Sequence, residues 1–152
     1  MKTWTFDAWR FVTIVGVLSI GAAPVVAHHS FAMYDQTVTK TLTGKLTRFV
    51  VGGNHSQLIF EVLGDDGKTS VDQKTGKTTM WQVETGSATA IARQGITVAS
   101  FPIGTIFTVT FYPLRDGRPQ GAVAGPLIRC GATFPAGGCN KDTGQLMTVP
   151  AN

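Results

Sequence analysis

The residues best suited to chemistry in this sequence are its three histidines, His28, His29 and His55. If an export signal is removed after Ala27, the free amine and imidazole of His28 can chelate one metal ion, with His29 as a third nitrogen donor. A cut one residue earlier makes His29 the third residue of the mature chain. The terminal amine, two backbone amides and the imidazole can then surround a square-planar ion. Nitrogen ligands of this kind favour Cu(II) first and Ni(II) or Zn(II) after it. Either cut therefore predicts a terminus that can bind copper.

Residues elsewhere in the chain could complete such a site. His55 stands where a turn enters an expected strand, and Asp35 or Glu84 could supply an oxygen ligand or orient a ligating imidazole. This arrangement requires the N-terminal segment to fold back over the domain. The other interpretation stays open: His28 and His29 are polar residues of a terminus, and His55 caps a turn.

The remaining candidate residues give little support for catalysis. Trp81 is expected to be a core residue, with a stacking surface for a ligand as the alternative. Glu84 has no second carboxylate paired with it, no serine lies in a nucleophile elbow, and the sequence contains no glycine loop typical of phosphate binding. The sequence therefore predicts that the protein is not an enzyme.

The first 27 residues have the anatomy of a secretory signal peptide. Lys2 and Arg10 precede an uncharged stretch, residues 11–27, which ends in small residues after Pro24. The stretch is short for a bilayer span and no basic stop signal follows it. We therefore expect cleavage after Ala27, a periplasmic or secreted mature protein, and no stable membrane anchor after cleavage.

Export also decides how the two cysteines are interpreted. Cys130 and Cys139 would meet an oxidising compartment, where a pair flanking a loop rich in glycine and proline favours a disulfide. A redox-active or metal-binding pair is the alternative, but the close spacing typical of such pairs is missing.

The composition is that of one small folded domain. With 43% hydrophobic and 14% charged residues, a packed core is expected rather than disorder. The net charge of +4 is spread along the chain without an arginine-rich run, so we expect no nucleic-acid partner. The 18 glycines favour short strands and turns over long helices.

Five expected strands and one expected helix would position the candidate residues. Apolar and β-branched residues predict strands at about 40–51, 55–63, 78–84, 105–112 and 120–128. A short helix is expected at 87–94, with Ser87 as its N-cap and Gly95 closing it. The polar residues 64–77 are expected to form an exposed loop or a hairpin tip.

This element order is that of the OB-fold. We therefore predict a mainly β protein, a small five-stranded Greek-key (OB-like) barrel with one short helix between strands 3 and 4. Gly44 would help the first strand to curve, through a bulge or a strong bend. The expected organisation is a signal peptide at 1–27, an N-terminal segment at 28–39, the barrel at 40–128 and a disulfide-containing tail at 129–152.

Several short motifs run in order through the mature chain: His28-His29-Ser30-Phe31, Tyr34-Asp35, Leu42-Thr43-Gly44, Asn54-His55, Trp81 with Glu84, Gly86-Ser87, and Pro113 with Asp116-Gly117. In these motifs the chain resembles a family of small exported bacterial proteins, catalogued only as a domain of unknown function, whose mature chains start with HHSF. The resemblance covers about residues 28–128 and implies export and a small barrel, but no particular activity. The family usually has Asn-Pro-His where this chain has Gly53-Asn54-His55.

Two functions follow as hypotheses. In the first, the protein binds copper, or a similar divalent metal, through His28, His29 and His55, and carries or buffers the ion. In the second, the protein is a noncatalytic accessory module that docks an exported enzyme or a saccharide, and the histidines are incidental.

Overall fold

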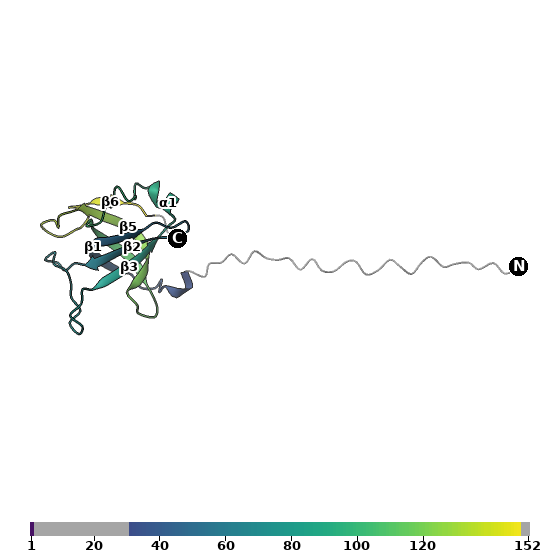
Figure 1. Ribbon diagram of the computed structural model, residues 1–152, viewed down its shortest axis with the longest axis horizontal. Helices are drawn as coiled ribbons and strands as arrows, with labels where there is room; N and C mark the ends of the chain where they lie inside the picture. The colour runs from purple at the N-terminus through teal and green to yellow at the C-terminus, as the bar shows by residue number, and fades with distance from the viewer. Residues whose placement is uncertain (2–30, 150–152) are drawn as a thin grey trace.

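A computed structural model of the 152-residue chain describes Met1 and residues 31–149. The predicted signal peptide, together with His28 and His29, lies outside the described residues. The elements, shown in Figure 1, follow in the order η1 (Phe31–Met33), β1 (Lys40–Val50), β2 (Ser56–Val62), β3 (Met80–Thr85), α1 (Ala88–Ala92), β4 (Ile106–Pro113), β5 (Gln120–Gly131) and β6 (Gln145–Met147). Within the described residues, no helix has the length and apolar character needed to cross a membrane.

Five strands close into a barrel. The hydrogen-bonded order runs β3-β2-β1-β4-β5, and parallel pairing of β3 with β5 joins the two ends. All other pairings within this ring are antiparallel. The predicted mainly β, OB-like barrel with one short helix between its third and fourth strands is thereby confirmed.

The first strand pairs with a different neighbour along each of its halves. Its first half, residues 40–45, pairs with β4, and residues 44–50 pair with β2. Gly44 lies where the pairings overlap, and a Cβ atom there would come 2.1 Å from the Phe60 ring. The irregularity in the ladder occurs between Leu46 and Arg48 rather than at Gly44. A bulge or bend is expected at Gly44 from the sequence, but the irregularity lies further along the strand, and Gly44 is needed for the close approach of the Phe60 ring.

The barrel interior is filled by alternate residues of each strand. In β4 the side chains of Phe107, Val109 and Phe111 are fully buried, as their alternation predicts. Phe107 packs edge to face against Phe60 and Phe101. The interior is therefore a packed core built around buried aromatic rings.

The short helix covers one end of this core. The Ser87 hydroxyl accepts a hydrogen bond from the amide of Ala90, and Gly95 has the positive φ of a helix-closing residue, as predicted. Ile91 of α1 and Ile96 after it are buried against the barrel residues. The helix therefore acts as a lid of aliphatic side chains on the barrel.

The C-terminal region is more closely joined to the barrel than the predicted boundary at residue 128 implies. β5 continues to Gly131, and β6 pairs with it. Met147 and Val149 enter the main core, which explains why this tail is ordered against the barrel. The predicted disulfide between Cys130 and Cys139 is confirmed, with Cα atoms 5.8 Å apart.

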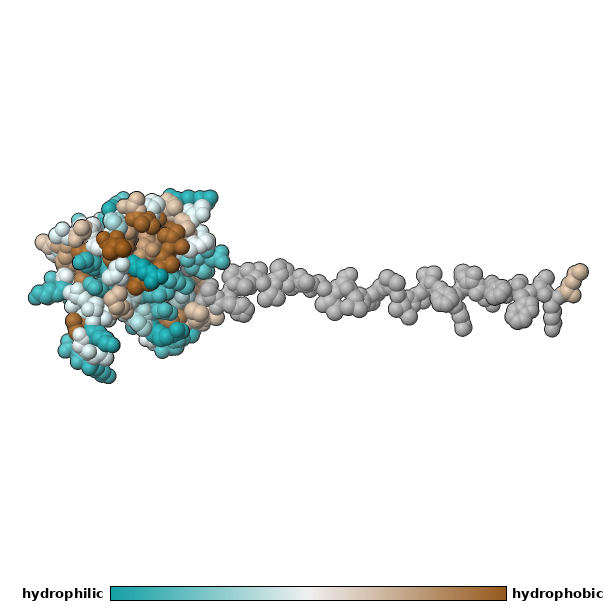
Figure 2. All heavy atoms as spheres, in the orientation of Figure 1, coloured by the Kyte–Doolittle hydropathy of each residue, from teal (hydrophilic) through white to brown (hydrophobic). Residues whose placement is uncertain are grey.

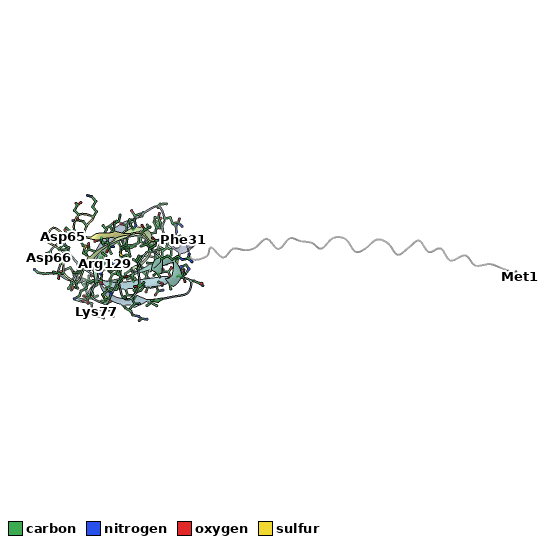
Figure 3. All side chains as sticks on the ribbon, turned by 90° about the horizontal axis from the view of Figure 1, so that it is seen from above. Met1, Phe31, Asp65, Asp66, Lys77 and Arg129 are labelled. Atoms are coloured by element: carbon green, nitrogen blue, oxygen red, sulfur yellow. A yellow bond between two sulfur atoms is a disulfide. The ribbon has the colours of Figure 1, made fainter. Side chains whose placement is uncertain are left out.

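The polar excursion at 64–77 forms two successive hairpin turns, which we call together the hairpin segment. Isolated bridges join Leu63 to Thr69 and Val71 to Thr78. Asp65 and Asp66, in the first of these turns, lie across the domain from Phe31 (Figure 3). The hairpin segment therefore marks the side of the barrel away from the N-terminal segment.

Candidate functional site

The N-terminal segment is fastened to the outer surface of the barrel. Tyr34 forms a bridge with Leu114, and the amide of Asp35 donates to the carbonyl oxygen of Pro113 over 2.8 Å. The backbone amide of Arg115 donates in turn to the carbonyl oxygen of Met33. These contacts join the start of the described chain to the turn between β4 and β5.

Tyr34 is the central residue of this attachment. Its side chain is only 3% exposed and packs with Leu114, Ala122 and Tyr112 on the outside of the barrel. Its hydroxyl donates a 2.9 Å hydrogen bond to Oε2 of Glu84 on β3. The ring of Phe31 meets the Tyr34 ring edge to face at 6.2 Å between centroids. Glu84, a predicted partner of the metal site, is therefore a partner of the segment that follows His28 and His29.

Burial raises the pKa of Tyr34 above its ordinary value of 10.0, and the hydrogen bond and negative charge of Glu84 raise it further. The folded protein therefore holds the phenol proton at pH values where the unfolded chain releases it. The contribution to stability is complete below pH 10 and is lost as the pH rises towards the folded-state pKa.

We therefore expect alkaline pH to loosen this attachment through Tyr34. The free energy of unfolding should fall above pH 10 in the wild type, and Tyr34→Phe should remove that component of the fall. Below pH 10 the variant should be less stable by about 1 kcal/mol, the typical contribution of one hydrogen bond. Urea unfolding between pH 8 and pH 11 measures both effects. Tyr112→Phe leaves the Glu84 hydrogen bond intact and is the control. If the free energy of unfolding of Tyr112→Phe also stopped falling above pH 10, the fall could not be assigned to Tyr34.

Asp35, the other predicted oxygen ligand, is occupied by local contacts. Its Oδ1 accepts hydrogen bonds from the hydroxyl and the amide of Thr37, and both lower the pKa of the Asp35 carboxyl. Nη1 of Arg115 lies 4.0 Å from Oδ1 of Asp35. Asp35 therefore stays a carboxylate that caps its own turn and faces a guanidinium.

His55 lies at the start of β2, beside the helix-covered end of the barrel. It precedes Ser56, whose amide donates to the carbonyl oxygen of Gly86, and it follows a tight turn in which Gly52 closely approaches its backbone. Glu84 on β3 pairs with Gln57 on β2, and His55 precedes Gln57 by two residues. Its Nδ1 atom is buried and has no hydrogen-bond partner among the described residues.

The metal site predicted from sequence is only partly described. Within residues 31–149, no three histidine, cysteine, aspartate or glutamate side chains are grouped closely enough to hold a metal ion. The structure brings Glu84 to the N-terminal segment through Tyr34 and leaves Asp35 with Thr37 and Arg115. The part played by His28 and His29 stays a prediction.

Trp81 is partly buried and belongs to the edge of the main core. Its ring lies 5.0 Å from the Phe111 ring, and the Lys40 ammonium group lies 5.2 Å from its centroid. Ligand stacking on Trp81 stays a prediction, but a ligand would compete there with contacts that the protein already makes.

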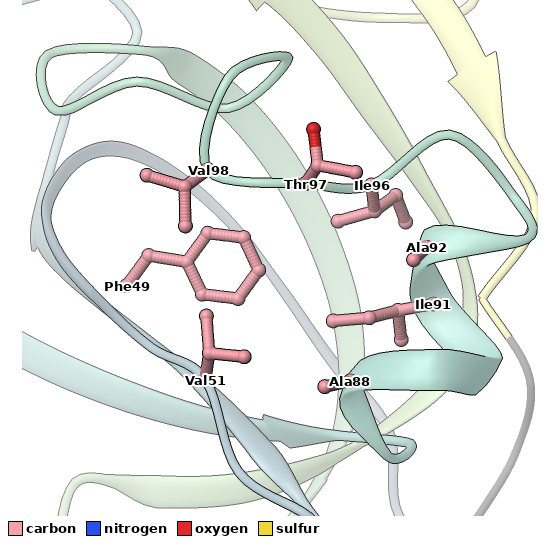
Figure 4. Close-up of a pocket in the computed structure, with 8 residues that line it drawn as sticks. All are labelled: Phe49, Val51, Ala88, Ile91, Ala92, Ile96, Thr97 and Val98. Carbon is pink, nitrogen blue, oxygen red and sulfur yellow. The ribbon is translucent and has the colours of Figure 1, made fainter.

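Sequence reasoning did not identify an apolar cavity beside α1. The cavity has a volume of about 240 Å³ and opens between the end of β1, the helix and the turn after it (Figure 4). Its walls are formed by Phe49, Val51, Ala88, Ile91, Ala92, Ile96, Thr97 and Val98. Because most of these residues fit core patterns in the sequence, only the structure shows that they also face an opening.

Comparison with known proteins places the chain in a family. A family model described as "Family of unknown function (DUF6152)" matches residues 13–123, so the chain belongs to that family, as its motifs suggested. No curated protein and no solved structure gives a significant match.

Proposed function

We propose that this member of the DUF6152 family is an exported, noncatalytic protein that binds copper through His28 and His29, with His55 as a third ligand. It would carry or buffer the ion in the periplasm. Ni(II) or Zn(II) would bind more weakly to the same site. The disulfide supports export because such bonds persist in oxidising compartments.

The hydrogen bond from Tyr34 to Glu84 is the observation that carries this proposal. It fastens the N-terminal segment to β3, close in register to the start of β2 and therefore to His55. His29 is two residues from Phe31, so the chain allows it to lie at most roughly 7 Å from that residue's position. This attachment supports the proposal, in which the terminal histidines would reach the part of the barrel that carries His55.

The environment of His55 also supports a ligand there. Buried ring nitrogens in folded proteins almost always have a partner, yet Nδ1 of His55 has none among the described residues. A metal ion, or a group on the segment that holds one, would satisfy this atom. Glu84 Oε2 already accepts from Tyr34, so its role would be to hold the segment in place rather than to bind the metal.

A Cu(II) titration of the mature protein tests the proposal. The protein is purified from a periplasmic fraction, its N-terminus is identified by mass spectrometry, and binding is followed by calorimetry. We expect one ion per chain with submicromolar affinity, which weakens as the pH falls because protons compete for the nitrogen ligands. Affinity in the high micromolar range, or binding that does not respond to pH, would contradict the proposal.

A docking module is the second candidate, and the apolar cavity beside α1 favours it. Exposed apolar surface next to a cavity is typical of interaction sites rather than of inert surface. This function would persist in metal-free protein, which separates it experimentally from copper binding.

A further inference from the structure

The helix-covered end of the barrel presents an apolar surface that its own chain leaves uncovered. Val51, Val98 and Ile103 are 53%, 59% and 75% exposed. Val51 and Val98 form part of the rim of the 240 Å³ cavity, and Ile103 lies on the next turn, beside Gly104, whose amide donates to the carbonyl oxygen of Leu46. Hydrophobic residues gather on this part of the surface in Figure 2. We call the cavity and these three side chains the apolar end.

The two segments that form the apolar end carry cationic side chains, and the acidic residue next to them in the sequence, Glu61, pairs in register with Lys45. These two segments, residues 45–60 and 86–105, contain Lys45, Arg48 and Arg93 and no acidic residue. All three cationic residues are exposed. The acidic side chains of the described chain lie on other segments, so an anionic partner would meet no repulsion from these two segments.

The lining of the cavity offers nothing to a polar ligand. Thr97 carries the one side-chain hydroxyl among the lining residues, and its oxygen already accepts a hydrogen bond from the amide of Ser100. A peptide entering the cavity would lose hydrogen bonds to water without replacement, whereas an acyl chain has none to lose. The cavity is also smaller than the about 300 Å³ at which pockets for whole small molecules begin.

We propose that the apolar end docks the protein on the surface of an anionic lipid bilayer. Val51, Val98 and Ile103 would enter the interface between headgroups and acyl chains, and the cavity would receive the end of a chain or a headgroup carbon. Arg48 and Arg93 would face the lipid phosphates. The cavity is too small to enclose a whole lipid, and the bilayer would cover the rest of the apolar end.

Co-sedimentation with lipid vesicles tests this inference. The metal-free mature protein is mixed with vesicles of phosphatidylglycerol and phosphatidylcholine, or of phosphatidylcholine alone. We expect binding only to the anionic vesicles, weakening as salt is added. Val98→Asp, at an exposed position that does not disturb the core, should lower partitioning about tenfold. The reversal Arg48→Glu/Arg93→Glu should lower it at least as much.

Matched control variants lie on the hairpin segment. Val71→Asp changes another exposed valine, and Lys74→Glu/Lys77→Glu makes the same change in net charge. We expect both controls to bind vesicles as the wild type does. Absence of vesicle binding, or equal losses in the control and test variants, would overturn the proposal. Capture of a protein through the apolar end without vesicle binding would also overturn it and assign the surface to a protein partner.

Discussion

Replacing His28 and His29 together with alanine should lower the affinity for Cu(II) by about 100-fold or more. The two residues supply most of the nitrogen donors of the proposed site, and changes merely to groups that support metal ligands already cost about 10- to 100-fold. His55→Ala should have a smaller effect, about tenfold, because the terminal donors would remain. Calorimetric titration of each variant with Cu(II), after its mature N-terminus has been checked, gives these ratios.

The stability of the barrel should not respond to this double replacement, because it leaves every described core residue unchanged. The variant should therefore unfold at the wild-type temperature. Gln36→Ala/Thr39→Ala changes two exposed residues of the same segment that carry no imidazole and should bind copper normally. Unchanged copper affinity in the histidine double variant, with the control also unchanged, would refute the terminal site.

The largest structural effect is expected at Gly44. In Gly44→Ala the new Cβ would come 2.1 Å from Cδ2 of Phe60 and 2.9 Å from the carbonyl oxygen of Glu61. Phe60 is fully buried and packed against Phe107, so its ring has no free space into which it can move. We expect a loss of at least about 3 kcal/mol of stability, or a failure to fold, because the strands must separate to admit one methyl group.

Gly53→Ala is the matched control, since a Cβ there would meet nothing within 4 Å. Its stability should remain within about 0.5 kcal/mol of the wild type. Thermal unfolding followed by circular dichroism should show a melting temperature about 10 °C or more lower for Gly44→Ala than for Gly53→Ala. Similar melting temperatures would mean that β1 tolerates a side chain at the point where it is shared between β2 and β4. Phe60→Leu should restore part of the stability of Gly44→Ala, since it removes part of the clashing ring.

The barrel could be predicted because its signals are local. The alternation of Phe107, Val109 and Phe111 defines a strand without knowledge of its neighbours, and Ser87 and Gly95 mark the ends of the helix. The loop composition between the cysteines and the expected compartment similarly indicated the disulfide.

The remaining features depend on contacts between distant residues. Tyr34 and Glu84 are 50 positions apart, and no periodic pattern links them. β6 has three residues, two of them exposed, so it carries too little alternation to be recognised. The residues around the cavity beside α1 match core patterns, and whether a core residue also faces an opening depends on how three segments meet.

The location of a bound copper ion tests the central claim most directly. Cu(II) is paramagnetic, so a substoichiometric addition to isotope-labelled mature protein broadens the NMR signals of nearby amides. We predict selective broadening of the signals of Tyr34, His55 and Glu84, while Asp65 and Asp66, across the domain from Phe31, stay sharp (Figure 3). Broadening at the hairpin segment instead, or no broadening of any barrel amide, would contradict a copper site formed by terminal histidines held against the barrel.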